Sequence, residues 1–346
     1  MNELLKEKLN KIERIFNIQK LMAVNADNSY IRSYYLKNKI PYTLFHTKQN
    51  FVHMGVSRDG TFKKSDLLEP AKFVGRYISE QNALSILELA TGRGANSFWL
   101  AKENPDSNFF GIDLSEGQLS FALKAAEKYS NFQVEIGDFH NLKQFKDNFF
   151  DIIFIVEALC YSSSTEKVLS EVQRVLKNGG HFIVFDGYLG DKSLSEDEKV
   201  AAKITEHGMA VAEFLKYQDL KQIALDLGLA VVEEEDLSQF VIPTMRRFER
   251  LAESFFKRPL IGRCIAQLLP QEFVNNSVSG MLMPVLFEEK VFEYWVTVFK
   301  KQKSLLLRVN FMLFHILLYQ WRWRELNPRP NQGAIMSLQC IVYPLI

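Results

Sequence analysis

A short glycine-containing segment, Glu88 to Gly94 (ELATGRG), has the residue types and spacing that most directly indicate chemistry. Gly92 and Gly94 have no side chain, so a ligand can approach the backbone closely there. Glu88 stands immediately before the turn, where its carboxylate can pair with a ligand ammonium group. The segment therefore predicts a binding loop for a small molecule that carries a positive charge.

Acidic residues recur where later strands are expected to end. Asp113 lies roughly twenty residues after the loop, where an acid typically binds ribose hydroxyls. Asp138 could bind an adenine amino group, with Phe139 against the ring, or it could simply cap a turn. Glu157 ends a strongly apolar run, and a carboxylate there indicates a functional role, unless it only orients a neighbouring loop.

Nicotinamide and flavin sites share the Gly-x-Gly pattern, but two details of this loop disfavour a dinucleotide. The dinucleotide fingerprint has a third small residue followed by close helix packing, and here Ser97 precedes the bulky Phe98 and Trp99. Glu88 would also repel a pyrophosphate. S-adenosylmethionine has the ammonium group and the ribose without any phosphate, so we expect it as the cofactor.

Alternating strand and helix patterns must position these residues. Ser115 and Gln118 form a capping-box signature at the start of one helix. The spacing predicts an α/β fold, namely a Rossmann-like, mostly parallel seven-stranded sheet with helices on both faces. A helical N-terminal segment and a helical insertion before the last strand complete it. The strands are expected at 85–89, 108–113, 132–136, 151–156, 181–185, 230–234 and 291–299, and the helices at 95–102, 115–129, 165–176 and 217–227. Asn178 to Gly180 is expected to form the turn that stops the third of these helices.

We expect five parts along the chain. They are an N-terminal helical and aromatic lid segment (1–65), a core (66–237), a helical cap insertion (238–288), the last core strand (289–303) and a C-terminal tail (304–346). The first twenty or so residues predict one amphipathic helix, packed on the core or lying on a membrane. Residues 34–54, rich in aromatics and histidines, predict either an irregular lid over an apolar ligand or plain core.

The insertion is expected to contain a helix after Pro243, whose basic face is either solvated or in contact with anionic lipid. Residues 305–318 are apolar but are interrupted by Arg308, Asn310 and His315, so they are too short and polar for a membrane span. The string that follows has no helix or strand period. We expect the functional chain to end near Lys303.

The charge balance and the cysteines exclude several classes of protein. The formal net charge is +1, from 42 basic and 41 acidic residues, so no nucleic-acid partner is expected. Cys160, Cys264 and Cys340 are far apart, so we expect neither a disulfide framework nor a metal site. Because no signal-peptide pattern opens the chain, a cytoplasmic location is expected, with peripheral membrane contact as an open alternative.

As a set, the Glu88 to Gly94 loop, Asp113, Gly137-Asp138, the apolar strand from Asp151 and the turn at 176–180 resemble the class I S-adenosylmethionine-dependent methyltransferases. Residues 157–161 (EALCY) are similar to a segment of sterol C-methyltransferases and their tocopherol and quinone relatives. The resemblance implies that Glu88, Ala90, Gly92 and Gly94 line the methionine end of the cofactor, Asp113 and Leu114 hold ribose and adenine, and Asp138 and Phe139 contact adenine. Thr91, also in this loop, stands where many members have Cys.

The expected reaction is methyl transfer to a small apolar or amphipathic metabolite of lipid, sterol, quinone or phenolic type. An oxygen acceptor needs at most one general base, whereas an alkene acceptor forms a carbocation that carboxylates and aromatic rings stabilise. The candidate catalytic residues are Glu157, His53 and His140, with Tyr35 and Tyr161 as flanking rings. Alternatives are a protein or RNA methyltransferase and a non-catalytic cofactor-binding or membrane-peripheral scaffold.

Overall fold

The computed structural model describes residues 3–24, 28–37 and 50–302. All of these except residue 302 belong to one compact unit, which ends at Lys301. Its strands form one seven-stranded sheet in the order β3-β2-β1-β4-β5-β7-β6. β7 is antiparallel to both neighbours, and the other adjacent pairs are parallel. This confirms the predicted fold class. The strands are β1 (Ser85–Leu89), β2 (Asn108–Asp113), β3 (Phe132–Ile136), β4 (Phe150–Val156), β5 (Leu176–Leu189), β6 (Leu229–Asp236) and β7 (Phe292–Lys301).

Helices cover both faces of the sheet because side chains of the central strands alternate between two cores. On β4, Ile152 and Phe154 pack in the core with helices α5 (Glu69–Gln81) and α6 (Ala95–Glu103). Ile153 and Ile155 pack in the other core, with helices α8 (Thr165–Val175) and α10 (Tyr217–Asp226). Helix α7 (Glu116–Ala126) packs on β3. Two short 3₁₀ helices are η2 (Lys64–Leu68) and η3 (Leu159–Tyr161).

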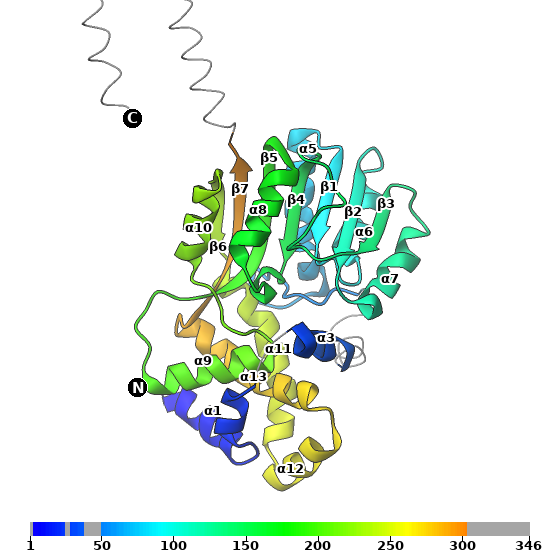
Figure 1. Ribbon diagram of the computed structural model, residues 1–346. Coiled ribbons are helices and arrows are strands. Elements are labelled where there is room, and N and C mark those ends of the chain that lie inside the picture. The colour runs from blue at the N-terminus through cyan, green and yellow to red at the C-terminus, as the bar shows by residue number, and fades with distance from the viewer. Residues whose placement is uncertain (1–2, 25–27, 38–49, 303–346) are drawn as a thin grey trace, which may run out of the picture. The chain divides into compact units, whose positions relative to one another are not determined.

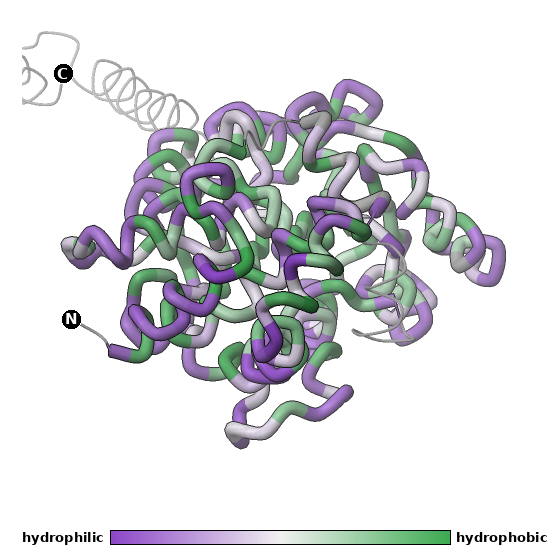
Figure 2. The backbone as a smooth tube through the Cα atoms, turned by 90° about the horizontal axis from the view of Figure 1, so that it is seen from below, coloured by the Kyte–Doolittle hydropathy of each residue, from purple (hydrophilic) through white to green (hydrophobic). Residues whose placement is uncertain are grey.

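A second layer of helices, here called the helical cap, lies below the sheet in Figure 1. Seen from below, its helices carry both hydrophilic and hydrophobic stretches (Figure 2). Buried side chains from α1, α9, α11 and α13 join the core that includes α5 and α6, so the cap packs as part of the same unit. The cap comprises α1 (Glu3–Glu13), α2 (Ile18–Met22), α3 (Asn28–Lys37), α9 (Glu196–Gly208), α11 (Ser238–Phe256), α12 (Pro259–Leu268) and α13 (Gln271–Glu288).

Two predicted helices have different bounds in the structure. The single N-terminal helix is wrong, because α1 ends at Glu13 and Asn17 caps a separate α2 by accepting a hydrogen bond from the Lys20 N–H. The insertion helix begins at Ser238, before Pro243 rather than after it. Proline removes one backbone hydrogen bond there, and burial of the surrounding apolar face, such as Val241 and Met245, outweighs that loss.

The predicted stop turn at Asn178 to Gly180 is also wrong. Helix α8 already ends at Val175, and residues 176–189 form one long strand. Gly179 has a φ of +82°, and a Cβ on Gly180 would lie 2.8 Å from the Asp151 carbonyl oxygen. The register of the β4–β5 pair is irregular between Phe150 and Ile152. The glycines therefore form a bulge within β5 rather than end a helix.

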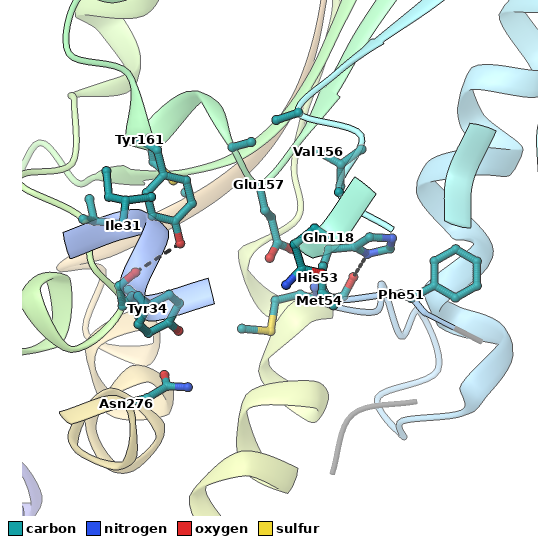
Figure 3. A pocket seen from close by; sticks show the side chains of 18 of the residues that line it. Ile31, Tyr34, Phe51, His53, Met54, Gln118, Val156, Glu157, Tyr161 and Asn276 are labelled. Atoms are coloured by element: carbon teal, nitrogen blue, oxygen red, sulfur yellow. Dashed lines mark hydrogen bonds between the residues drawn. The ribbon is translucent and has the colours of Figure 1, made fainter. Parts of the chain in front are cut away.

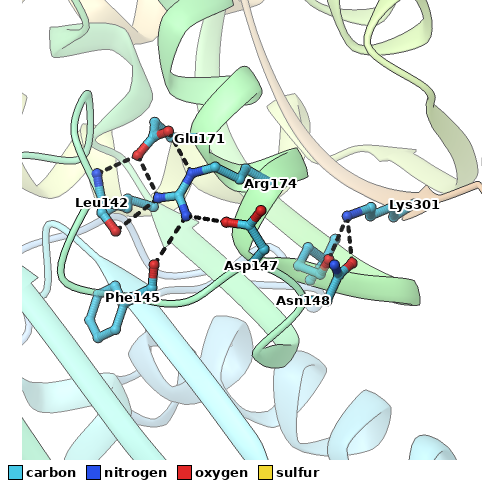
Figure 4. Close-up of polar contacts among 8 residues, drawn as sticks. Leu142, Phe145, Asp147, Asn148, Glu171, Arg174 and Lys301 are labelled. Carbon is cyan, nitrogen blue, oxygen red and sulfur yellow. Dashed lines mark hydrogen bonds and ion pairs between the residues drawn. The ribbon is translucent and has the colours of Figure 1, made fainter.

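Arg174 of α8 anchors the loop between β3 and β4 (Figure 4). Its guanidinium donates to the carbonyl oxygens of Leu142 and Phe145, at 2.9 and 3.0 Å, and to the carboxylates of Glu171 and Asp147. The rigid fork of arginine donors matches this arrangement, which a lysine could not reproduce. The loop that carries Phe139 and His140 is therefore held from its far end.

We predict that Gly94→Ala lowers the free energy of unfolding more than Gly228→Ala does. Both glycines have positive φ, +75° and +77°, so both substitutions carry a conformational cost of about 1–2 kcal/mol. Only at Gly94 would the new Cβ also clash, 2.9 Å from the Cβ of Ala122, which adds about 1–3 kcal/mol. Urea denaturation of both variants measures the difference, and equal losses would show that the Gly94 contact is not tight.

Candidate functional site

The described residues enclose a cavity of about 480 Å³ between the carboxyl edge of the sheet and the helical cap. The strand order reverses between β1 and β4, so the loops after these two strands diverge and leave a crevice. Ends of β1, β2, β4 and β5 line the cavity from the sheet side. Helices α3, α11 and α13 line it from the cap side. Ligands of open parallel sheets bind at this position.

The glycine loop follows β1 and has the backbone conformation that its sequence predicts. Gly92 and Gly94 have φ values of +55° and +75°, and Ala90 has +51°, which is uncommon for a residue with a side chain. The Gly92 N–H donates to Asp113 Oδ2 at 2.8 Å, and the Ser115 N–H donates to Asp113 Oδ1 at 2.7 Å. One carboxylate thereby fixes the loops after β1 and β2 relative to each other.

Glu88 is buried at the end of β1 and lines the cavity. Its Oε2 accepts hydrogen bonds from the hydroxyl groups of Thr91 and Ser97, both at 2.6 Å. Among the described residues, its Oε1 accepts one hydrogen bond, from the Asn96 amide at 3.2 Å. Burial raises the pKa of Glu88, while these donors favour the carboxylate. Glu88 therefore orients the glycine loop and still has a lone pair on Oε1 for a ligand donor.

Asp113 and Leu114 both line the cavity, and burial raises the pKa of the Asp113 carboxyl group. Phe139 and His140 line it as well, whereas Asp138 is not among the described lining residues. The side chain of Asp138 is 45% exposed, and its Oδ1 lies 2.7 Å from His140 Nδ1. The same Oδ1 also accepts the His140 backbone N–H at 2.9 Å, so both contacts with His140 use one oxygen. The predicted cofactor residues thus gather at one edge, with Asp138 outside the wall.

Glu157 is the candidate catalytic group with an uncommitted oxygen. It follows β4 with a φ of +51°, a conformation that costs a residue with a side chain free energy. Its Oε1 accepts hydrogen bonds from the Met54 N–H at 2.7 Å and the Tyr294 hydroxyl at 2.8 Å. Within the described residues, no hydrogen bond reaches its Oε2. Figure 3 shows Glu157 and Met54 near the centre of the cavity, between Tyr161 and His53. Burial raises the pKa of Glu157 to about 8.

A further buried acid, Asp186, was not identified from the sequence. It lines the cavity from β5, and its carboxylate accepts from the N–H groups of Gly187 and Cys160, at 2.8 and 3.1 Å. Burial raises its pKa to about 6. Burial beside Asp186 also raises the pKa of the Cys160 thiol, so this cysteine is not an activated nucleophile.

Both candidate histidines make hydrogen bonds to neighbouring groups of the chain. His140 accepts the Ser163 N–H at Nε2, which leaves the proton on Nδ1 toward Asp138. His53 has Nδ1 at 2.9 Å from the Met54 carbonyl oxygen and Nε2 at 3.2 Å from Asn96 Oδ1, and burial lowers its pKa. Both rings line the cavity. Their hydrogen bonds favour structural or orienting roles over proton transfer.

The flanking aromatic residues fall partly outside the described part of the chain. Tyr161 lines the cavity, and its hydroxyl donates to the Met209 carbonyl oxygen at 3.1 Å. The side chain of Tyr35 lies outside the described residues, as do residues 38–49 of the predicted lid. Tyr34, one position earlier on α3, is buried and lines the cavity instead.

The cap side of the cavity is mainly apolar. Met245, Phe248, Phe255, Phe273 and Met283 of α11 and α13 contribute to it, opposite the acids of the sheet edge. A concave site with an apolar wall and a few convergent polar groups is typical of small-molecule binding. The described residues include no cluster of three or more potential metal ligands. No helix among them has the length and apolarity needed to cross a membrane.

Residues 80–230 match the model of the family described as "Methyltransferase domain". This region spans the glycine loop, Asp113 and Glu157. The 24-methylenesterol C-methyltransferase 2 of Arabidopsis thaliana is 30% identical over 158 residues, which are 44% of this chain and 43% of that protein. The chain thus matches less than half the length of this relative. The resemblance to methyltransferases, and to the sterol C-methyltransferase group within them, is confirmed for this region.

Two solved structures share the fold at low identity. A putative sarcosine dimethylglycine methyltransferase from Galdieria sulphuraria has a TM-score of 0.63 at 15% identity, over 77% of this chain and 98% of that chain. The [4+2]-cyclase SpnF also has a TM-score of 0.63, at 17% identity, over 79% of this chain and 96% of that chain. One name is that of a methyltransferase and the other that of a cyclase, so the fold alone does not fix the reaction.

We predict that Glu157→Gln changes how stability depends on pH. The folded pKa of Glu157, about 8, lies above the ordinary value of 4.5. Between these values the folded wild type keeps a proton that the unfolded chain loses, so its free energy of unfolding falls as pH rises. Glutamine does not ionise. The stability of the variant relative to wild type should therefore rise by about 3.5 kcal/mol from pH 5 to pH 8.

Urea denaturation at several pH values measures this difference. Glu135→Gln is the matched control, because Glu135 is exposed on β3, away from the cavity wall. Its stability curve should run parallel to that of the wild type. A parallel curve for Glu157→Gln as well would mean that Glu157 is ionised in the folded protein at neutral pH.

Proposed function

We propose, on the premise that residues 80–230 are a methyltransferase domain, that this protein transfers a methyl group from S-adenosylmethionine to a small lipophilic acceptor. The observation that carries the proposal is one continuous cavity with two unlike halves. One half is formed by the glycine loop, Glu88 and Asp113. The other is formed by apolar side chains of the cap, and Glu157 lies where the two halves meet.

The residues present fit this cofactor. Gly94 lies so close to Ala122 that a side chain would not fit, which keeps the loop compact against α7. Glu88 Oε1 can accept from an ammonium group, and Asp113 keeps lone pairs for ribose hydroxyls after accepting from Gly92 and Ser115. Ala90, Thr91, Gly92 and Leu114 supply the adjoining wall. Phe139 would lie against adenine, and the free oxygen of Asp138 would accept from its amino group at the rim.

S-adenosylmethionine supplies a methyl group already activated on a sulfonium. The chain therefore has to hold the acceptor in line and exclude water, which the apolar cap wall can do. Glu157 Oε2 would accept a proton from the acceptor, while Met54 and Tyr294 fix the position of the carboxyl group. With a pKa of about 8, Glu157 acts as a base only in the ionised fraction, so the rate should increase toward alkaline pH.

The cavity also bears on the other candidate activities. A protein or RNA methyltransferase needs an open groove for a macromolecule, whereas here helices of the cap line the cavity opposite the sheet edge. A scaffold without catalysis would not need an uncommitted carboxyl oxygen at the junction of the two halves. We further propose that the protein works at a membrane surface, because a lipophilic acceptor resides in membranes.

We predict that Asp113→Asn lowers the affinity for S-adenosylhomocysteine by at least about tenfold. The variant replaces a charged acceptor by an amide whose NH₂ group would face either the Gly92 or the Ser115 N–H, and charged hydrogen bonds contribute about 1.5–3 kcal/mol. Isothermal titration calorimetry measures the affinity. Asp106→Asn is the control, since Asp106 is exposed just before β2, at the opposite edge of the sheet. Unchanged affinity in Asp113→Asn would remove Asp113 from the cofactor site.

Incubation of the purified protein with methyl-labelled S-adenosylmethionine and a total lipid extract tests the reaction itself. We expect label in the organic phase, and at least tenfold less with Glu157→Gln, because general-base catalysis typically contributes about 10²–10⁴-fold. Parallel incubations with RNA and with a protein extract serve as competing acceptors. Label in either of these and none in lipid would overturn the proposed acceptor class, and binding without any transfer would favour a scaffold.

A further inference from the structure

Helix α12 carries aliphatic side chains that the rest of the described chain leaves uncovered. Leu260 and Leu268 are 78% and 83% exposed, and Ile261 and Leu269 are 50% and 40% exposed. We call these four residues the α12 patch. Figure 1 places α12 at the end of the helical cap farthest from the sheet. Clustered exposed aliphatic residues at one end of a molecule indicate an interaction surface.

The orientation of α12 is fixed, so the exposure of the patch is not a consequence of a loosely placed helix. Gly262 faces inward, where an added Cβ would lie 2.6 Å from Ile15 Cδ1. Arg263 Nε donates to the carbonyl oxygen of Arg14 at 2.7 Å. Leu260 and Leu268 are two helical turns apart and therefore project to one side, away from Gly262. Because Gly262 packs inward, the two leucines on the other side of the helix point to solvent.

Basic side chains flank the patch in the sequence. Residues 250–270 contain four basic residues and one acid, Glu253. All four basic residues are exposed, and none of them takes part in an ion pair within the described residues. They are Arg250, Lys257, Arg258 and Arg263. Aliphatic side chains bordered by cations complement a bilayer whose surface carries negative charge.

The patch also continues into the cavity. Leu269, which belongs to the patch, and Leu251 of α11, which is 43% exposed, both line the cavity. Phe255 and Phe273 line it nearby. The apolar half of the cavity therefore reaches the surface beside α12. A lipophilic molecule entering here from a bilayer would stay in contact with apolar groups throughout.

We infer that the α12 patch and its four flanking cations dock the protein on an anionic membrane surface, where the apolar half of the cavity takes up its acceptor. The uptake step rests on the proposed function, whereas docking itself requires only the patch. Leu260, Ile261 and Leu268 insert among the acyl chains. Lys257 and Arg258 contact the lipid phosphates and carboxylates.

Vesicle co-sedimentation tests the inference with the full chain. Vesicles of phosphatidylcholine are compared with vesicles that also contain phosphatidylserine, at low and high salt. We expect binding to the mixed vesicles that weakens with salt. The double variant Leu260→Ser/Leu268→Ser should lower the partition coefficient at least about tenfold, because each leucine loses an apolar side chain that the bilayer would bury. Lys257→Glu/Arg258→Glu should abolish the preference for phosphatidylserine.

Leu84→Ser/Leu225→Ser is the matched control, since these leucines are 56% and 57% exposed outside the cap. It should bind vesicles like the wild type. Thermal unfolding and S-adenosylhomocysteine affinity of each variant show separately whether folding or the cofactor site has changed. Absence of vesicle binding by the wild type, or equal loss in the control, would overturn the inference. A dimer that the α12 substitutions dissociate in gel filtration would instead assign the patch to a second copy of the chain.

Discussion

The Asp113 carboxylate is the contact on which the arrangement of the site depends. It accepts one backbone N–H from the glycine loop and one from the residue before α7, so it holds the loops after two separate strands together. Neither loop is regular, and both would otherwise have unpaired N–H groups at a partly buried edge. The same carboxylate faces the cavity. In the proposed function, cofactor binding and loop structure would therefore be coupled through a single side chain.

Four acids line the cavity. Besides Asp113 they are Glu88, Asp186 and Glu157, and these three differ in the number and placement of the donors around them. Glu88 accepts four hydrogen bonds and Asp186 accepts backbone N–H groups on both oxygens, so each is held in place. Glu157 has both of its donors on one oxygen. Burying a carboxyl group with one oxygen that has no hydrogen bond costs free energy, unless that oxygen binds a ligand or carries a proton. That imbalance, together with the positive φ at Glu157, is the geometric basis for proposing Glu157 as the base.

The sequence was sufficient for the core because its signals are local. Apolar alternation, the loop glycines and the acid after each strand all lie within one β-α unit, so the sheet and most of the predicted cofactor residues could be placed. Tyr294 could not be placed, because it reaches Glu157 from 137 positions away through the antiparallel pairing of β7 with β5. Asp186 was not identified because it lies within a mostly apolar strand, β5, rather than after its end. The bulge at Gly179 replaced a predicted turn because sheet pairing prevailed over local propensity.

The helical cap supplies much of the apolar side of the cavity, on which the proposed class of acceptor depends. Under the proposed function the glycine loop and its acids hold the methyl donor, and solved structures with the same fold carry names from different reaction classes. Much of the apolar wall comes from α3, α11 and α13, which lie outside residues 80–230, and Met209, Val211 and Phe214 add to it from within that region. Because α12 joins α11 to α13, a contact of the α12 patch with a bilayer would act directly on the two helices that line the acceptor half. Membrane docking and acceptor selection would then depend on the same short segment.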